Sequence, residues 1–184
     1  PKTTTTEKLN VSHLPEKDNH YGVNLTKVTD AAGKNLNYVV NKTMMRIDLP
    51  KVLKKGEKFT FKIDWNYNIP NRIAMGGRGG YEFFTEDGND LYTITQWFPR
   101  LCVYSDHQGW QNHQFTGRGE FALVFGNYKV NINVPADHIV GATGEGKNFD
   151  KVLTSAQYSR YQQAKTAKEP IEIVTLEEAK KAED

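Results

Sequence analysis

The sequence of 184 residues has one cysteine, no long apolar run and no marked excess of charge. A single cysteine, Cys102, excludes an intrachain disulfide and a zinc cluster built from thiolates. Its neighbours Leu101 and Val103 favour a buried structural thiol over a nucleophile. No stretch approaches the roughly 20 apolar residues of a membrane span. With 24 basic and 22 acidic residues the formal net charge is +2, which argues against a nucleic-acid or membrane-surface partner.

Common catalytic motifs are also missing. The sequence contains no His-Glu-x-x-His, no Gly-x-Ser-x-Gly, no Ser-x-x-Lys and no phosphate-binding loop. The five histidines lie in separate segments, and no two of them are spaced four residues apart as ligands on one helix face would be. Asp106, His107 and His113 share one polar loop, so a small metalloenzyme built on them is a third alternative, although loop histidines are more often simply exposed.

Two glycine-containing segments resemble ligand loops only in part. Gly76 to Gly80 reads GGRGG and lacks both the Lys-Ser/Thr of a phosphate loop and the repetition of an RNA-binding tract. We expect a flexible loop from Ile73 to Gly80, with Arg78 able to act at a site or an interface. Asp87 to Asp90 lacks the later ligands of a calcium loop and therefore predicts a hairpin turn.

Alternation of apolar and polar residues predicts a mainly β protein. The clearest run extends from Phe59 to Tyr67, with aromatic and aliphatic side chains on one face. Shorter runs predict further strands in 23–28, 36–40, 45–49, 81–84, 121–125, 128–134 and 139–143. Gly126-Asn127, between two of these runs, is compatible with a hairpin turn or with a bulge. Short strands separated by turn residues favour an antiparallel β-sandwich.

The composition changes after Gly146. Two capping boxes, each of which predicts the start of a helix, are Thr154 with Gln157 and Thr175 with Glu178. Pro170 ends the first of these helices, and a short strand is expected at 171–174. Residues 147–184 are therefore predicted to form a helix–strand–helix segment.

An ordered series of short motifs runs through residues 56 to 145. In chain order they are Gly56-Glu57-Lys58-Phe59, Gly79-Gly80-Tyr81, Thr95-Gln96-Trp97-Phe98-Pro99-Arg100, Val103-Tyr104-Ser105-Asp106, Gly109-Trp110, Gln114-Phe115, Gly119-Glu120-Phe121, Phe125-Gly126-Asn127-Tyr128-Lys129-Val130, Val134-Pro135 and Val140-Gly141-Ala142-Thr143-Gly144-Glu145. The series resembles the N-terminal domain of zinc aminopeptidases of the aminopeptidase-N family, the gluzincins, and most closely a bacterial branch of that family. The resemblance covers most of residues 56 to 184.

The resemblance implies a saddle-shaped β domain that precedes a thermolysin-like catalytic domain and covers its active-site cleft. It implies that Gln96 reaches the pocket for the amino-terminal residue of the substrate. The family's second Gln or Glu, two positions later, is replaced by Phe98. One zinc ion is expected in the parent catalytic domain, and no cofactor in this segment, which lacks the zinc ligands and the Gly-x-Met-Glu-Asn motif. The segment alone is expected to be inactive. The resemblance also implies that residues 1–184 belong to one N-terminal β domain that lacks its first and last strands, with residues 147–184 as a helix–strand–helix insertion within it.

The leading hypothesis is thus a non-catalytic N-terminal domain of a zinc-dependent aminopeptidase. Its expected partners are the downstream catalytic domain and a peptide substrate, in a bacterial cell envelope or periplasm, with the cytoplasm as the alternative compartment. The alternative function is a stand-alone β-sandwich module that binds peptide or glycan through aromatic loops. An incomplete sheet also predicts association through its unpaired edges.

Overall fold

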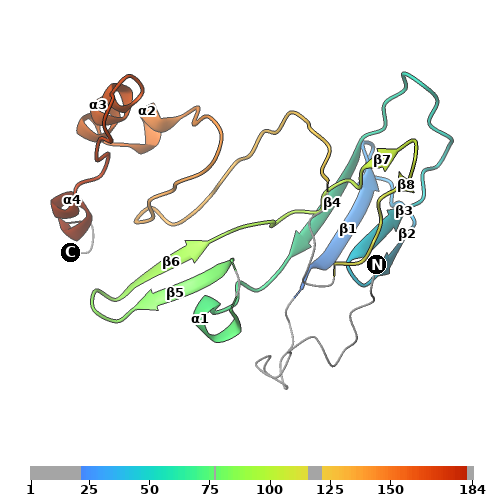
Figure 1. Ribbon diagram of the computed structural model, residues 1–184, viewed down its shortest axis with the longest axis horizontal. Helices are drawn as coiled ribbons and strands as arrows, with labels where there is room; N and C mark the ends of the chain where they lie inside the picture. The colour runs from blue at the N-terminus through green and yellow to red at the C-terminus, as the bar shows by residue number, and fades with distance from the viewer. Residues whose placement is uncertain (1–21, 77, 116–121, 182–184) are drawn as a thin grey trace. The chain divides into compact units, whose positions relative to one another are not determined.

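The protein is mainly β. The computed structural model describes residues 22–76, 78–115 and 122–181, and the chain divides into two compact units, Pro1–Gly126 and Asn127–Asp184. The strands of the described residues form small antiparallel sheets of two strands each, and the helices are short (Figure 1). Mainly antiparallel β structure agrees with the alternation in the sequence.

The first sheet pairs β1 (Asn24–Asp30) with β4 (Phe61–Asn66), so it joins two strands that are distant in the sequence. β1 ends in a turn in which the Asp30 carboxylate accepts hydrogen bonds from two backbone amides beyond it, each at 2.9 Å. The chain then returns so that the Leu36 amide donates to the Val28 carbonyl at 3.0 Å. Val28 and Leu36 are only 3% and 6% exposed, and they are the buried apolar side chains of the described residues.

The second sheet is the hairpin of β2 (Tyr38–Asn41) and β3 (Met44–Ile47), which turns through Lys42 and Thr43. The side chain of Gln114 holds this turn from a distant part of the chain. Its Oε1 accepts from the Thr43 amide at 2.9 Å and from the Thr43 hydroxyl at 2.7 Å, and its Nε2 donates to the last carbonyl of β2 at 2.8 Å. The segment around Gln114 is thereby fixed beside the hairpin.

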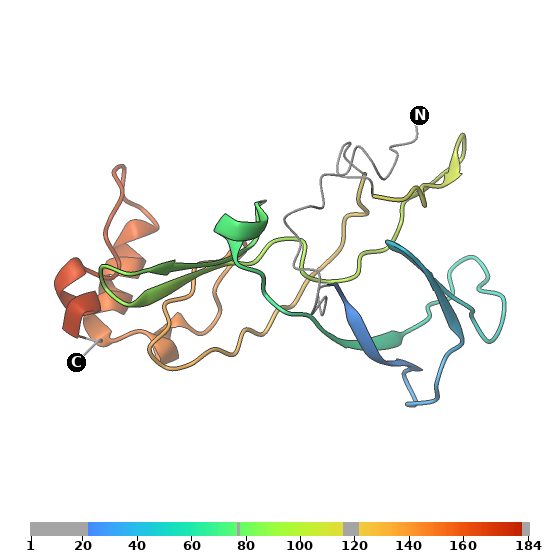
Figure 2. The ribbon, with the colours of Figure 1, turned by 90° about the horizontal axis from the view of Figure 1, so that it is seen from below.

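The third sheet is the hairpin of β5 (Gly80–Phe84) and β6 (Asn89–Thr93). The predicted hairpin is confirmed, although its turn spans residues 85–88, and Asn89 and Asp90 belong to β6. A short helix, α1 (Arg72–Met75), precedes it, and Figures 1 and 2 show this helix beside the start of β5. An ion pair between Arg72 and Glu82 joins the helix to the strand. Residues 73–75, expected as the start of a flexible loop, are thus helical. The helix begins here because the Asn71 side chain caps it, with Oδ1 accepting from the Ala74 amide at 2.9 Å. Gly77 lies outside the described residues.

The fourth sheet is the small hairpin of β7 (Tyr104–Ser105) and β8 (Gly109–Trp110). Of the strand predicted at 121–125, the described part contributes an isolated bridge between Cys102 and Leu123. The start of that strand, with the motif Gly119-Glu120-Phe121, lies outside the described residues.

The strands predicted at 128–134 and 139–143 do not form in the described residues, and these predictions were wrong. Alternation of apolar and polar residues shows only that the side chains of a segment could line the two faces of a sheet. A strand also needs a neighbour for its backbone hydrogen bonds, and no described segment supplies one.

The C-terminal unit carries α2 (Phe149–Val152), α3 (Ser155–Ala164) and α4 (Leu176–Lys181). Both predicted capping boxes are present, because Thr154 and Gln157, and likewise Thr175 and Glu178, exchange hydrogen bonds between side chain and backbone. The strand predicted at 171–174 does not form. Instead the Ile173 carbonyl accepts from Nε of Arg160 on α3 at 2.9 Å, so a side chain takes the place of a neighbouring strand.

Large apolar side chains remain exposed along the sheets of the first unit. On the β5–β6 hairpin, Phe83 and Leu91 are 55% and 50% exposed, and Val39 and Val40 on β2 are similarly open. No β-sandwich is formed by the described residues. Two-stranded hairpins are marginally stable in water unless another layer covers one face, so these faces are suited to contact with further protein.

Candidate functional site

Gln96 lies in the loop that follows β6, and its backbone has an uncommon conformation. Its φ is +49°, in the left-handed region that non-glycine residues rarely adopt. Among the described non-glycine residues this feature is shared with Lys42, which turns the β2–β3 hairpin. Residues held in such conformations often belong to functional sites, because the surrounding structure must keep them there. Gln96 is also exposed to solvent.

A cavity of about 120 Å³ opens beside this loop. It is lined by Gly22, Val23, Tyr67, Thr95, Gln96 and Trp97. Burial raises the pKa of the Tyr67 phenol further above neutral pH, and the protonated hydroxyl can donate a hydrogen bond. The lining contains no charged side chain. Two aromatic rings and one carboxamide therefore offer apolar contact together with a hydrogen-bond donor and acceptor, which suits an apolar side chain next to a group that forms hydrogen bonds.

The loop is joined to β4 through Trp65. The indole N–H of Trp65 donates to the carbonyl oxygen of Trp97 at 3.2 Å, and the two rings stack with centroids 6.2 Å apart. Phe98 packs against the Trp97 ring at 4.9 Å, and the Arg100 guanidinium lies 5.9 Å from the Phe98 centroid. Phe98 is thus a packing residue of this loop, and Gln96 is the carboxamide of the cavity.

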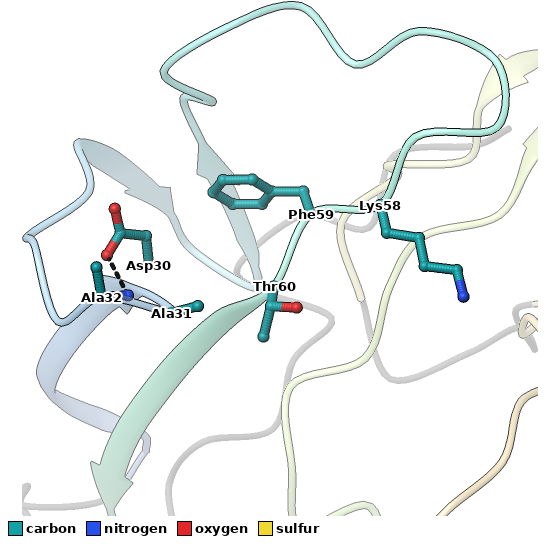
Figure 3. A pocket seen from close by; sticks show the side chains of 6 residues that line it. All are labelled: Asp30, Ala31, Ala32, Lys58, Phe59 and Thr60. Atoms are coloured by element: carbon teal, nitrogen blue, oxygen red, sulfur yellow. Dashed lines mark hydrogen bonds between the residues drawn. The ribbon is translucent and has the colours of Figure 1, made fainter.

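A larger hollow of about 340 Å³ lies at the end of the β1–β4 sheet (Figure 3). It is lined by Asp30, Ala31, Ala32, Lys58, Phe59 and Thr60. The Asp30 carboxylate bonds the amides of its own turn, and Figure 3 shows Lys58 pointing away from it. This lining places no nucleophile beside a base and no aromatic wall opposite a carboxamide. The smaller Gln96 cavity therefore has the more specific arrangement.

The histidine loop does not gather into a metal site. The Nδ1 of His107 lies 3.5 Å from the Asp106 carboxylate, but both side chains are largely exposed. His113 is exposed as well. Over residues 22–76, 78–115 and 122–181, no group of three or more His, Cys, Asp or Glu side chains converges where it could hold a metal ion.

Cys102 has the setting of a structural thiol. It is half-buried, its Sγ lies 3.8 Å from the Sδ of Met44, and its backbone forms the bridge to Leu123. Neither of these contacts involves a titratable group. Such a cysteine acts as a small packing residue rather than a nucleophile.

Sequence reasoning missed the neighbours of Gln96. Trp65 and Tyr67 were recognised only as members of an alternating strand, and their meeting with a loop some thirty residues later is a tertiary contact. Gly79 was assigned to a flexible loop, although a Cβ at this position would lie 3.1 Å from Oγ1 of Thr95. The available signal was the pair of aromatic residues at the end of the 59–67 run. Arg78, in the same loop, is exposed and does not line the cavity.

Comparisons of the chain with protein-family models, with curated proteins and with solved structures find no match. Among the described residues, no helix has both the length and the apolar character needed to cross a membrane. The functional assignment therefore depends on the motifs in the sequence and on the geometry around Gln96.

Proposed function

We propose that this chain is a non-catalytic N-terminal β domain of a zinc-dependent aminopeptidase, in which the Gln96 loop helps to bind the amino-terminal residue of a peptide. The observation that carries this proposal is the position of Gln96. It lies, with φ of +49°, on an uncharged cavity walled by Tyr67 and Trp97. The same residue belongs to the motif Thr95 to Arg100, which resembles the substrate-binding loop of the family.

The chemistry of the cavity suits this role. A free amino terminus titrates near pH 7.7–8.0, so at neutral pH it is largely an ammonium group that needs acceptors. The Gln96 carboxamide oxygen can accept one of its hydrogen bonds, while the rings of Tyr67 and Trp97 contact an apolar side chain. Because the lining has no charge, neutral amino-terminal residues are the preferred substrates. Zinc-bound water and a Glu general base would come from the downstream catalytic domain.

The exposed strand faces support an accessory domain rather than an autonomous one. The apolar residues of β5 and β6 stand open on a two-stranded hairpin, as do those of β2. In the proposed enzyme, further strands of the same domain cover these faces and complete the saddle-like sandwich. The catalytic domain then lies against the completed sheets, and the Gln96 loop faces its cleft.

The proposal is tested by substitution in the intact enzyme. The parent reading frame is expected to encode His-Glu-x-x-His downstream. Gln96→Ala is expected to raise KM for neutral aminoacyl substrates by roughly tenfold or more, because a hydrogen bond to a charged group is lost. Gln108→Ala is the matched control, since Gln108 is an exposed residue of the β7–β8 turn. Unchanged KM and kcat in Gln96→Ala would refute the proposal.

A stand-alone module for peptide or glycan is the second candidate. The aromatic walls of the cavity favour it, because exposed rings such as Trp97 stack on sugar faces. A stop codon soon after Asp184, together with glycan- or peptide-induced quenching of Trp97 fluorescence, would select this function instead. A downstream zinc motif selects the aminopeptidase.

A further inference from the structure

Trp65 makes two contacts with the loop that carries Gln96. Its indole N–H donates to the Trp97 carbonyl at 3.2 Å, and its ring stacks on the Trp97 ring at 6.2 Å with an interplanar angle of 26°. Trp65 itself is fixed on β4, where it pairs with Leu25 of β1. That sheet also holds the buried Val28. The loop is therefore attached to the best-packed part of the first unit.

The contacts of Trp65 with Trp97 lie directly next to Gln96, whose backbone conformation must be held by its neighbours. Gln96 has φ of +49°, and a non-glycine residue leaves this region unless neighbouring contacts hold it there. The Trp97 carbonyl lies one residue beyond Gln96, so its hydrogen bond fixes the chain on the C-terminal side of the kink. On the other side, Thr95 lies close to the backbone of Gly79, where an added Cβ would be 3.1 Å from its Oγ1. The kink is thus held on its C-terminal side by the Trp65 hydrogen bond, and on its N-terminal side Thr95 lies against Gly79.

We propose that Trp65 is a positioning residue for Gln96. Its N–H acts through Trp97 to keep the left-handed kink, and its ring fixes Trp97 as a wall of the cavity. This inference rests on the proposed function for its effect on substrate binding, whereas the hydrogen bond and the kink are properties of the chain itself. Trp65 touches no substrate, since it does not line the cavity.

The 184-residue chain tests the contact without any catalytic domain. In the wild type, hydrogen exchange of the Trp65 indole N–H, followed by NMR, is expected to be at least roughly tenfold slower than that of Trp110. Trp110 is the matched control because it is 55% exposed and packs only on Tyr104 among the ring contacts of the described residues. Equal exchange rates for the two indoles would overturn the inference, even if no Trp65 variant folds.

Substitution then tests the action on Gln96. Trp65→Phe keeps an aromatic ring and removes the donor, so it is expected to shift the backbone amide resonances of Gln96 and Trp97. Trp110→Phe is expected to leave them in place. In the intact enzyme, Trp65→Phe is expected to raise KM roughly fivefold with kcat unchanged, the effect of losing one neutral hydrogen bond. In the Gln96→Ala background, Trp65→Phe is expected to cause no further rise in KM, because the hydrogen bond of Gln96 to the substrate, through which Trp65 acts, is already lost.

The outcomes separate the two proposals. An equal rise in KM with and without Gln96 would show that Trp65 acts elsewhere and would overturn its positioning role. Unmoved Gln96 resonances in Trp65→Phe would overturn it as well. If Gln96→Ala leaves the kinetics unchanged but Trp65→Phe still shifts the Gln96 amide, the aminopeptidase role of the loop fails while the positioning of Gln96 by Trp65 stands.

Discussion

Arg160 on α3 and Glu178 on α4 form an ion pair that joins the two helices of the C-terminal unit. The same guanidinium donates through Nε to the Ile173 carbonyl at 2.9 Å, and the same carboxylate accepts from the Thr175 amide at 2.9 Å. One pair of side chains therefore fixes the segment between the helices and caps the second helix.

The first prediction concerns pH. The Arg160 hydrogen bond, followed by that from the Thr175 amide, lowers the pKa of Glu178 from 4.5 to about 2. A carboxylate whose pKa is lower in the folded state stabilises the fold above its unfolded pKa, and this contribution is lost as the pH falls toward the folded value. Helicity of the C-terminal unit is thus expected to decrease between about pH 5 and pH 2, which far-ultraviolet circular dichroism measures.

Glu178→Gln is expected to remove most of this pH dependence and to lower helicity already at neutral pH. Glu177→Gln provides the matched control, because Glu177 is the exposed neighbour in the first turn of the same helix. A titration that is the same in wild type and Glu178→Gln would contradict the role given to the ion pair.

The second prediction concerns Gly80, the first residue of β5. Its φ is +139°, and a Cβ there would lie 2.5 Å from the Pro70 carbonyl oxygen, which accepts the Tyr81 amide at 2.8 Å. Gly80→Ala is expected to push the hairpin away from Pro70 and to destabilise it by about 1–3 kcal/mol. Hydrogen exchange of the Tyr81 amide is the measurement, and its rate is expected to increase roughly tenfold or more.

Gly141→Ala is the control for this substitution. A Cβ at Gly141 meets no atom within 4 Å, and its φ lies outside the left-handed region. Its effect on the Tyr81 amide should be negligible. Full protection of Tyr81 in Gly80→Ala would show that the close approach to Pro70 is not needed for the hairpin.

Local patterns predicted those elements whose partners are close in the sequence or whose caps are local. The β5–β6 hairpin and both capping boxes depend on a few neighbouring residues. The side chain of Thr154, for example, accepts a hydrogen bond from the Gln157 amide, and the side chain of Gln157 accepts one from the Thr154 amide, all within one turn of helix. Such features are readable without knowing the rest of the fold.

Contacts between distant segments were not predictable in this way. The alternation in residues 128–134 indicates one apolar face. A strand forms there only if another strand pairs with it, and the alternation does not show which strand that would be. The pairing of β1 with β4 and the contact of Trp65 with Trp97 could likewise not be predicted from the sequence pattern. Gln96 was identified through its motif, whereas its cavity wall Tyr67 becomes visible only in three dimensions.

The third prediction concerns association through the segment 129–134. Val130, Ile132 and Val134 are exposed, and the segment joins no sheet of the described residues. In an antiparallel pair of two copies centred on Asn131, Val130 lies opposite Ile132, and Lys129 lies opposite Asn133. Apolar faces then coincide, and no two lysines oppose each other, so this register is favoured over a parallel one. We expect the isolated chain to dimerise with increasing concentration, as measured by light scattering.

Cysteine cross-linking tests this register directly. In a Cys102→Ser background, Asn131→Cys places two thiols on the symmetry axis, directly opposite each other and within disulfide range. Asn133→Cys is the matched control on the same face. Its two thiols would be separated by roughly 13 Å along the strands, too far for a disulfide. Oxidation is therefore expected to trap a dimer of the first variant and not of the second. Equal cross-linking of both variants would contradict the register. A chain that stays monomeric at high concentration would contradict the association itself, which requires this unpaired apolar segment to pair with a second copy.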